Sequence, residues 1–297
     1  MIPLPVELIE EIVRALCTPQ YPLQYGHKTD VLRTLRQLSL VNRLLFHITT
    51  PYLYSSIVIS SHRELRAFLS ISPSLRLHTT SLWLKQVPDS AMFPLIADLL
   101  RDLGPHLRRL ALDIPGSELD TSTPVREALR CCIHLEDFTR SGYSPMQVIQ
   151  PHPVWRRWTA LRRLALDGPL INDTFINYVS ELPHITHLAL IEPRWKYSPD
   201  GTEIAAFLRL LEAGQRFQRV LLIYCNGDDL HLNSLRRLRA VLKLRGLREG
   251  LDILYMIKHE KAPAPMKMIR SQIGAGSLWD LHSRNILAFP IGCRLAL

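Results

Sequence analysis

The N-terminal residues carry apolar side chains at the spacing of an amphipathic helix. The apolar stripe consists of Leu8, Ile9, Ile12, Val13 and Leu16, and three glutamates lie on the opposite face. Pro5 suits the first turn of a helix, where its missing N–H is not needed, and the helix dipole favours glutamates near this end. The pattern therefore predicts a helix that begins at Pro5 and packs its apolar stripe against another surface.

A second helical pattern follows a predicted loop. Residues 17–30 are rich in Pro, Tyr and Gly, which is typical of a loop. Apolar residues then recur at steps of three and four, which predicts one amphipathic helix; they are Val31, Leu32, Leu35, Leu38, Val41, Leu45 and Ile48. We expect this helix to end before Pro51, because the residue that precedes a proline is disfavoured in the helical region. Ile57 and Ile59 then lie on one face of a predicted strand.

The middle of the chain repeats itself. LRRLALDIP at 107–115 returns as LRRLALDGP at 161–169, which is 54 positions later, or two periods of 27. Each related segment fits a Leu-x-x-Leu-x-Leu frame, and its fourth position is occupied by Leu82, Leu110, Phe138, Leu164, Leu188 and Val220. These positions are separated by 28, 28, 26, 24 and 32 residues. Such spacing is typical of leucine-rich repeats, in which each unit is one strand and a helical or irregular return.

Helix-like segments at 93–104, 124–132, 172–183 and 203–214 lie between the predicted strands. Strands that alternate with helices predict a parallel sheet with an outer helical layer. The ninth position of the frame is usually Asn or Cys in regular repeats, but here it is proline at Pro115, Pro169 and Pro193. Because proline has no backbone N–H, we expect an uneven arc whose strands end sharply at these prolines.

Side chains alternate along a strand, so frame positions four and six face the helices and positions three, five and seven share the concave face. Position three reads Ser81, Arg109, Asp137, Arg163, His187 and Arg219, and position five reads Trp83, Ala111, Thr139, Ala165, Ala189 and Leu221. We predict that this face binds a target protein, and the candidate contact residues are Trp83, Arg109, Arg163, His187 and Arg219. The arginines would bind carboxylates or phosphates.

A second interpretation of the concave arginines stays open. Arg109 and Arg163 are followed four residues later by Asp113 and Asp167 on the same face, so pairing within each strand would neutralise them. The remaining tail opens with a Pro/Ala-rich stretch, and we expect Trp279 to cover the open end of the last repeat.

Composition narrows the class of protein. No uncharged apolar run approaches the ~18 residues of a membrane span, so we expect a soluble protein without a membrane partner. Five scattered cysteines without a Cys-x-x-Cys pair argue against a disulfide framework or a zinc site, and indicate a reducing compartment, either cytoplasm or nucleus. The net charge of +9 is compatible with nucleic acid or an acidic protein. The arginines are scattered in ones and twos, which favours a protein partner.

Catalytic motifs are missing from the sequence. It contains no phosphate-binding loop, dinucleotide fingerprint, nucleophile elbow or His-Glu-x-x-His zinc motif. We therefore predict a protein that is not an enzyme and that needs no cofactor or metal.

Two ordered segments near the N-terminus carry a family resemblance. LPVELIEEIV and LRQLSLVNRLLFHITTPYLYSSIVI resemble an F-box of the kind common in fungal proteins. Leu4, Pro5, Glu7, Leu8, Ile12 and Leu16 fit the first part of the F-box pattern, and Leu38, Val41, Arg43, Pro51, Leu53 and Tyr54 fit the second. Asn42 stands where Cys is usual, and the loop between the two parts is longer than the common pattern. The repeats similarly resemble the irregular leucine-rich repeats that follow F-boxes.

The resemblance implies a substrate-recognition adaptor of an SCF-type ubiquitin ligase. Its F-box would dock on the Skp adaptor and through it on the cullin complex, and the implied contact residues are Leu4, Pro5, Glu7, Leu8, Ile12, Leu38, Val41 and Leu53. The expected fold is α/β, with an all-α F-box at 1–56, an irregular leucine-rich-repeat-like solenoid with parallel strands at 57–260, and a tail or cap at 261–297. Two alternatives stay open. The N-terminal apolar residues could only cap the repeat core, and the protein could be a scaffold that binds protein or nucleic acid without a ligase.

Overall fold

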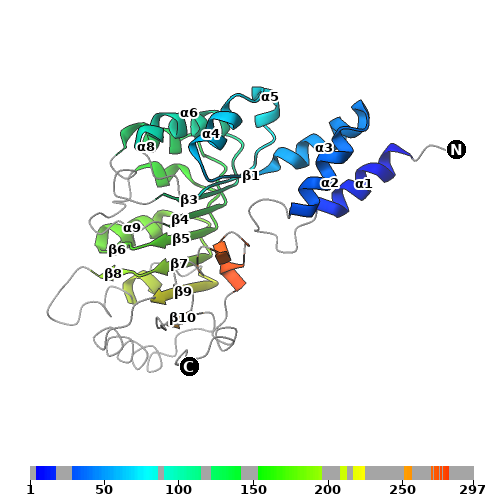
Figure 1. Cartoon of the computed structure of the whole chain (residues 1–297). Helices are drawn as coiled ribbons and strands as arrows, with labels where there is room; N and C mark the ends of the chain where they lie inside the picture. Colours follow the sequence, from blue (N-terminus) through cyan, green and yellow to red (C-terminus); the bar gives the residue numbers. More distant parts are fainter. Residues whose placement is uncertain are drawn as a thin grey trace, which may run out of the picture.

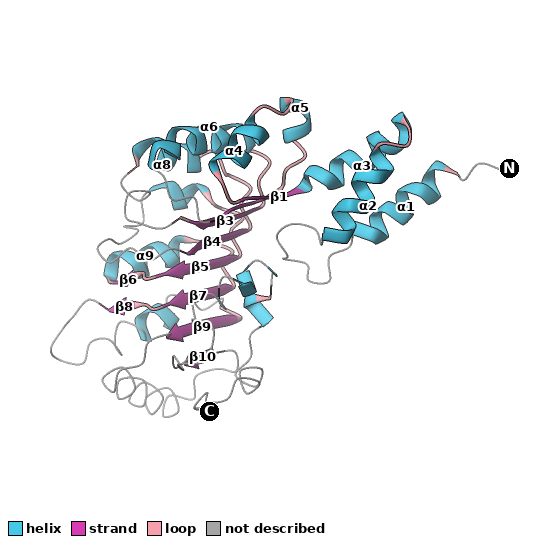
Figure 2. Ribbon diagram, viewed as in Figure 1, coloured by secondary structure: helices cyan, strands magenta, loops and turns pink. Residues whose placement is uncertain are grey.

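The computed structural model of the chain describes residues 5–17, 29–85, 90–114, 122–141, 153–195, 208–212, 217–224, 251–255, 269, 271–273, 275 and 277–280. A unit of three helices at the N-terminus leads into a parallel sheet that carries helices along one face (Figures 1 and 2). The predicted α/β class with parallel strands is therefore confirmed.

The N-terminal unit consists of α1 (Val6–Cys17), α2 (Thr29–Ser39) and α3 (Arg43–Ser55). Its small interior contains four buried apolar side chains, namely Val13, Cys17, Leu35 and Ile48. Only part of the predicted stripe supplies this interior, because Val13 is buried with Ile9 and Leu16 packed against it while Leu8 and Ile12 are exposed. Burial raises the pKa of the Cys17 thiol to about 11, so this cysteine stays neutral and apolar in character.

The single helix expected over 31–48 is wrong, because the chain breaks between Ser39 and Arg43. Asn42 is the N-cap of α3, and its side-chain oxygen accepts a hydrogen bond of 2.8 Å from the backbone N–H of Leu45. An asparagine cap satisfies one of the free N–H groups at the start of a helix, so it favours a new helix over a continuous one.

The expected end of the helix before Pro51 is also wrong, because Pro51 lies inside α3. The preceding threonines bond back to their own helix, with Thr49 Oγ1 at 2.7 Å from the Leu45 carbonyl and Thr50 Oγ1 at 2.6 Å from the Phe46 carbonyl. Both threonines are buried. Packing of this turn therefore outweighs the backbone preference of the residue before proline.

The sheet contains eight parallel strands in the order β1-β2-β3-β4-β5-β7-β9-β10. They are β1 (Ser56–Ile59), β2 (Ser81–Lys85), β3 (Arg109–Asp113), β4 (Asp137–Ser141), β5 (Arg163–Asp167), β7 (His187–Ile191), β9 (Arg219–Tyr224) and β10 (Leu251–Tyr255). The six fourth-position residues predicted from the repeat lie next to one another across the sheet, from Leu82 to Val220. The repeat frame and its register are confirmed.

A repeated hydrogen-bond pattern fixes where each strand begins. Two successive N–H groups, those of Arg108 and Arg109, both donate to the Thr80 carbonyl, at 2.8 and 3.0 Å. The same arrangement joins 136 and 137 to the Arg108 carbonyl, and it recurs at the carbonyls of 136, 162 and 186. Strands β3, β4, β5, β7 and β9 therefore each take their register from one oxygen atom of the preceding repeat.

Helices of the outer layer cover one face of the sheet (Figure 1). They are α4 (His62–Leu69), α5 (Pro73–Arg76), α6 (Phe93–Leu103), α8 (Thr123–Leu129) and α9 (Asp173–Glu181), with the short turns η1 (Ser90–Met92) and η2 (Pro153–Arg157). The predicted segments at 93–104, 124–132 and 172–183 thus hold helices, and residues 208–212 of the fourth are helical. Their apolar faces pack on frame positions four and six in one continuous core.

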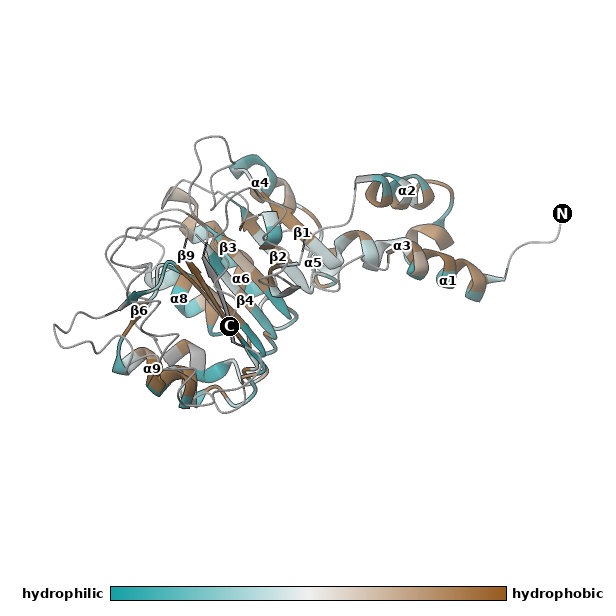
Figure 3. Ribbon diagram, turned by 90° about the horizontal axis from the view of Figure 1, so that it is seen from below, coloured by the Kyte–Doolittle hydropathy of each residue, from teal (hydrophilic) through white to brown (hydrophobic). Residues whose placement is uncertain are grey.

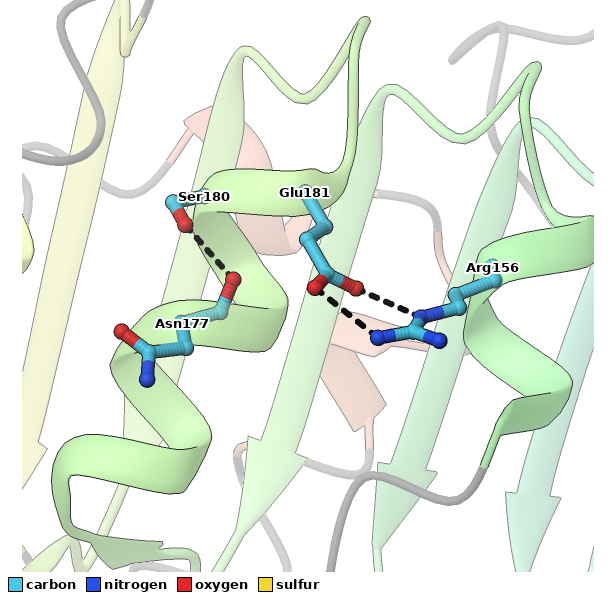
Figure 4. Close-up of polar contacts among 4 residues, drawn as sticks. All are labelled: Arg156, Asn177, Ser180 and Glu181. Atoms are coloured by element: carbon cyan, nitrogen blue, oxygen red, sulfur yellow. Dashed lines mark hydrogen bonds and ion pairs between the residues drawn. The ribbon is translucent and has the colours of Figure 1, made fainter.

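Contacts along the outer layer join neighbouring repeats. Gly104 follows α6 at a place where a Cβ would lie only 2.9 Å from Cys131 Cβ and 2.5 Å from the Leu100 carbonyl, so only glycine allows this approach. Further along, the guanidinium of Arg156 in η2 binds both carboxylate oxygens of Glu181 in α9, at 2.8 and 3.1 Å (Figure 4). This ion pair is exposed, and it lowers the pKa of Glu181 through the hydrogen bonds from Arg156.

Pro169 and Pro193, two of the prolines expected to end strands, each lie in a short interruption between two strand segments. β5 ends at Asp167 and β7 at Ile191, where Gly168 and Glu192 adopt φ values of 65° and 48°. After Pro169 and Pro193 the chain resumes as β6 (Leu170–Ile171) and β8 (Arg194–Trp195), which pair in parallel as a second, two-stranded sheet. The expected sharp ends thus become bends, while Pro115 lies outside the described residues.

Candidate functional site

The N-terminal unit exposes several of its apolar side chains. Leu8 and Ile12 on α1 are 48% and 58% exposed, and Val41 in the turn before α3 is 66% exposed. Pro5 and Glu7 are exposed as well. The start of α1 and the α2–α3 turn both lie at the end of the unit that is away from the sheet (Figures 1 and 3). These side chains are therefore available to a partner.

The other residues implied by the F-box resemblance have different positions. Leu38 and Leu53 are partly buried and pack on the interior of the helical unit. Leu4 lies outside the described residues. Within this set, a packing role is thus observed for Leu38 and Leu53, and free apolar surface is observed for Leu8, Ile12 and Val41.

Sequence reasoning missed three further exposed apolar residues next to Val41. Leu40, Leu44 and Phe46 are 85%, 43% and 41% exposed. They were missed because a continuous helix over 31–48 would have distributed these positions around its circumference. The signal that could have found them is Asn42, a good N-cap residue that is followed three positions later by an apolar residue. We call Val6, Leu8, Ile12, Leu40, Val41, Leu44 and Phe46 the N-terminal apolar surface.

The second candidate site is the sheet face opposite the helices, formed by frame positions three, five and seven, which we call the inner face. Frame position five, from Trp83 to Leu221, is buried at every member. The cover is the chain's own C-terminal segment: Ile269, Ile273, Leu278 and Trp279 join the floor residues in one buried cluster. Figure 1 shows this segment on the side of the sheet opposite the outer helices.

The expected position of Trp279 at the open end of the last repeat is wrong. Trp279 lies in the turn η3 (Leu278–Asp280), over the middle of the sheet and not beyond its last strand. Its ring meets the ring of His187 edge to face, with 5.7 Å between centroids, and its carbonyl accepts a hydrogen bond from the guanidinium of Arg219. A small floor of alanines leaves room for the indole, so the side chain fills the inner face.

One candidate arginine, Arg163, pairs across strands. Arg163 Nε lies 3.1 Å from Asp137 Oδ2 on the neighbouring strand, and the two side chains are 20% and 3% exposed. The structure thus gives Arg163 a different carboxylate partner from the Asp167 that the sequence suggested. Arg109 lies on β3, which pairs with the edge of β4 opposite β5, and it is the register partner of Asp137. Its positive charge lowers the pKa of the same carboxylate.

Charged groups on the inner face shift the pKa values of their neighbours. Burial lowers the pKa of His187, and the positive charges of Arg163 and Arg219 lower it further. Burial raises the pKa of Asp137, and the charges of Arg163 and Arg109 oppose this shift. Two arginines therefore act on one buried carboxylate, and Asp113 and Asp167 supply two further carboxylates at frame position seven of the same face.

One buried charge was missed entirely. Arg140 occupies frame position six, where the neighbouring strands carry leucine, and it is only 6% exposed. Burial lowers its pKa to about 10, and the charge of Asp167 counteracts part of that shift. The frame alone gives no signal for it, since position six faces the helices and predicts an apolar residue.

Two searches for other kinds of site were negative. Within the part of the chain that the structure describes, no three metal-binding side chains come together. In the same residues, no helix is both long and apolar enough to cross a membrane.

Comparisons with known proteins show no family for this chain. No protein-family model matches the sequence, and no curated protein matches it. Among solved structures, an internalin from Listeria monocytogenes is similar, with 11% sequence identity, a TM-score of 0.31, and coverage of 88% of this chain and 94% of the internalin. At that score the comparison carries no argument of its own. The chain's own parallel strands, one per repeat and in register, describe a leucine-rich-repeat-like solenoid.

Proposed function

We propose that this protein is the substrate-recognition subunit of an SCF-type ubiquitin ligase and is not itself an enzyme. Its N-terminal helices dock on the Skp adaptor, which links it to the cullin complex, and its repeat domain holds a target protein. The contribution to the reaction is proximity, because a bound target presents its lysines to the conjugating enzyme at high effective concentration. The proposed compartment is the cytoplasm or the nucleus, where no membrane partner is required.

The observation that carries this proposal is the N-terminal apolar surface. Leu8 and Ile12 occupy the F-box-like Leu-Pro-x-Glu-Leu start and its continuation, yet both point away from the interior formed by Val13, Cys17 and Leu35. Exposed apolar residues are usually scattered singly, whereas here several belong to the start of α1 and the α2–α3 turn, which lie at the same end of the unit, and this is typical of an interaction site. Each leucine or isoleucine that a partner covers contributes roughly 1.5–3 kcal/mol before other costs.

Co-purification with a Skp adaptor tests the proposal. We expect the wild-type chain to bind, and Leu8→Asp combined with Ile12→Asp to abolish binding, because both carboxylates would be desolvated at the contact. Leu77→Asp is the matched control, since Leu77 is a similarly exposed leucine, at 45%, in the repeat domain. Charge reversal at Arg109 and Arg163 should also leave adaptor binding intact.

Failure of the purified wild-type chain to bind any Skp adaptor would contradict the ligase role. Retained binding to a partner protein would then favour a repeat scaffold without a ligase. Steep salt dependence of binding to nucleic acid would favour a nucleic-acid scaffold in its place.

A further inference from the structure

The turns that lead into the strands carry a column of histidines. Frame position zero is the residue before the first position of each repeat, and in the repeats of β2, β3, β4, β5 and β7 it reads His78, His106, His134, Ala160 and His184. All four histidines are exposed, and the residue that follows each of these five positions is buried. Ala160 interrupts the column with one small, partly buried side chain.

The register of the sheet places this alanine between two of the histidines. The first residues of β4, β5 and β7 pair side by side, and the residues three positions earlier are His134, Ala160 and His184. The register extends toward the turns, because the N–H of Arg162 donates to the Glu136 carbonyl at 2.8 Å. Neighbouring strands lie roughly 5 Å apart, so one imidazole flanks Ala160 on each side. We call His134, Ala160 and His184 the Ala160 gap.

Two arginines without an ion pair belong to the connection that contains Ala160. Arg157 ends η2 and Arg162 precedes β5, and both side chains are exposed. The N–H of Leu161 donates to the Trp158 carbonyl at 3.1 Å, so one tight turn connects the two arginines. Among the described residues, neither guanidinium takes part in a hydrogen bond or an ion pair. Both guanidiniums are therefore available to an anion from outside the chain.

The charges on either side of this connection are already matched. Three ion pairs match them: Arg108 with Glu136, Arg130 with Glu127, and Arg156 with Glu181 (Figure 4). By register Glu136 also neighbours Arg162, but its carboxylate lies 3.3 Å from Arg108 on the other side. The unmatched positive charge is thus confined to one connection. Nucleic acid is bound through many phosphate contacts along a backbone, so a short acidic protein segment fits this arrangement better.

We propose that the connection around the Ala160 gap binds an acidic segment of a partner protein. One carboxylate lies over Ala160, where the imidazoles of His134 and His184 donate hydrogen bonds to it. Arg157 and Arg162 bind this carboxylate or the next one through charge-assisted hydrogen bonds. This inference rests on the proposed function only in calling the partner a ligase target. Its test uses the purified full chain and requires no adaptor.

Two synthetic peptides with an N-terminal fluorophore and a C-terminal amide provide the probe. One contains four glutamates in the order Gly-Glu-Glu-Gly-Glu-Glu-Gly, and the other has glutamine in place of every glutamate. Fluorescence anisotropy at one physiological ionic strength measures their binding to the full chain. We expect the glutamate peptide to bind the wild type at least about fivefold more tightly than the glutamine peptide. Arg157→Gln combined with Arg162→Gln should remove this difference.

Arg63→Gln combined with Arg66→Gln is the matched control. Both arginines are exposed on α4, and their replacement removes the same two charges. α4 belongs to the repeat before β2, which lies three strands from β5, or roughly 15 Å. Charges at that distance are screened at physiological ionic strength, where the Debye length is ~8 Å. Binding of the glutamate peptide to this control should therefore stay close to the wild-type value.

Ala160→Leu tests the gap without changing any charge. The larger side chain occupies the space between the imidazoles, so binding of the glutamate peptide should fall to the level of the glutamine peptide. Ala160→Ser keeps a small side chain at this position and should retain binding.

Equal binding of the two peptides to the wild-type chain would overturn the site. An equal loss in the Arg63 and Arg66 control would overturn its location, and unchanged binding to Ala160→Leu would overturn the role of the gap. A deoxythymidine pentamer carries four phosphates, and tighter binding of this pentamer than of the glutamate peptide would overturn the choice of a protein partner.

Circular dichroism verifies that each variant is folded. Arg157 and Arg162 are exposed, so their replacement should leave the fold intact and keeps the test decisive even if Ala160→Leu does not fold. Adaptor binding is a separate readout, so failure here is distinguishable from failure of the ligase role.

Discussion

The N-terminal unit and the repeat sheet use amphipathic sequence in opposite ways. In the sheet, both faces are covered by the chain itself, since outer helices lie on one face and Ile269, Ile273, Leu278 and Trp279 lie on the other. In the helical unit, a small interior is closed while Leu8, Ile12 and Val41 stay exposed. The difference teaches that an apolar stripe predicts which face needs a partner, but whether that partner belongs to the same chain depends on tertiary structure.

The largest expected difference between the two regions appears when one apolar residue in each is replaced by alanine. Leu164→Ala removes a fully buried side chain between two strands and should lower the free energy of unfolding by about 2–5 kcal/mol. Ile12→Ala removes a side chain that is 58% exposed and should change it by less than about 0.5 kcal/mol. Urea denaturation followed by circular dichroism measures both values.

A large loss of stability in Ile12→Ala would show that α1 is covered by the chain, and the distinction between the two regions would then collapse. Leu110→Ala provides a second buried position in the repeat frame, and it should behave like Leu164→Ala.

A smaller effect is expected at the cap of α3. Asn42→Ala removes the acceptor for the Leu45 N–H and should destabilise the helical unit by about 1 kcal/mol. Asn42→Asp keeps an acceptor at the same position and should retain most of the stability. Hydrogen exchange should localise the loss to α2 and α3, and a loss spread into the sheet would instead indicate that the two regions unfold as one.

The smallest effect concerns the pH response of the inner face. The pKa of His187 is lowered in the folded chain. As the pH falls below the unfolded value of 6.5, the imidazole is therefore protonated more readily in the unfolded chain than in the folded chain, which favours unfolding. The contribution of His187 to stability is therefore complete above this pH and decreases as the pH falls toward the folded pKa. Between about pH 7 and about pH 5, thermal unfolding of His187→Gln should depend less on pH than that of wild type. Identical slopes would contradict the burial of this histidine.

Much of the repeat domain could be predicted from sequence because its pattern is redundant. Leu110, Leu164 and Leu188 recur in the same frame, so parallel pairing of equivalent positions is enough to define the register of their strands. The exposure of Leu8 and Ile12 is compatible with the docking role that the resemblance implied, although docking itself stays a prediction.

The rest depended on contacts that a local pattern does not encode. Pro51 stays inside α3 through the packing of Thr49 and Thr50, and Asn42 divides a stretch whose apolar spacing is continuous. The cover of the inner face comes from residues more than forty positions beyond the last repeat segment of the predicted frame. Periodicity shows that Ala165 and Ala189 face away from the helices, but it cannot show that Trp279 returns to cover them.

The shared carbonyl at each strand entrance has a consequence for how such an array can change over time. Because two N–H groups attach β3, β4, β5, β7 and β9 each to one oxygen of the preceding repeat, alignment is set locally at that point and not by the number of residues between strands. Insertions and deletions in the outer layer then alter loop length without shifting a single side chain on the sheet. Separations from 24 to 32 residues coexist here with unbroken register, so the outer layer can diverge in length while the inner face keeps its pattern.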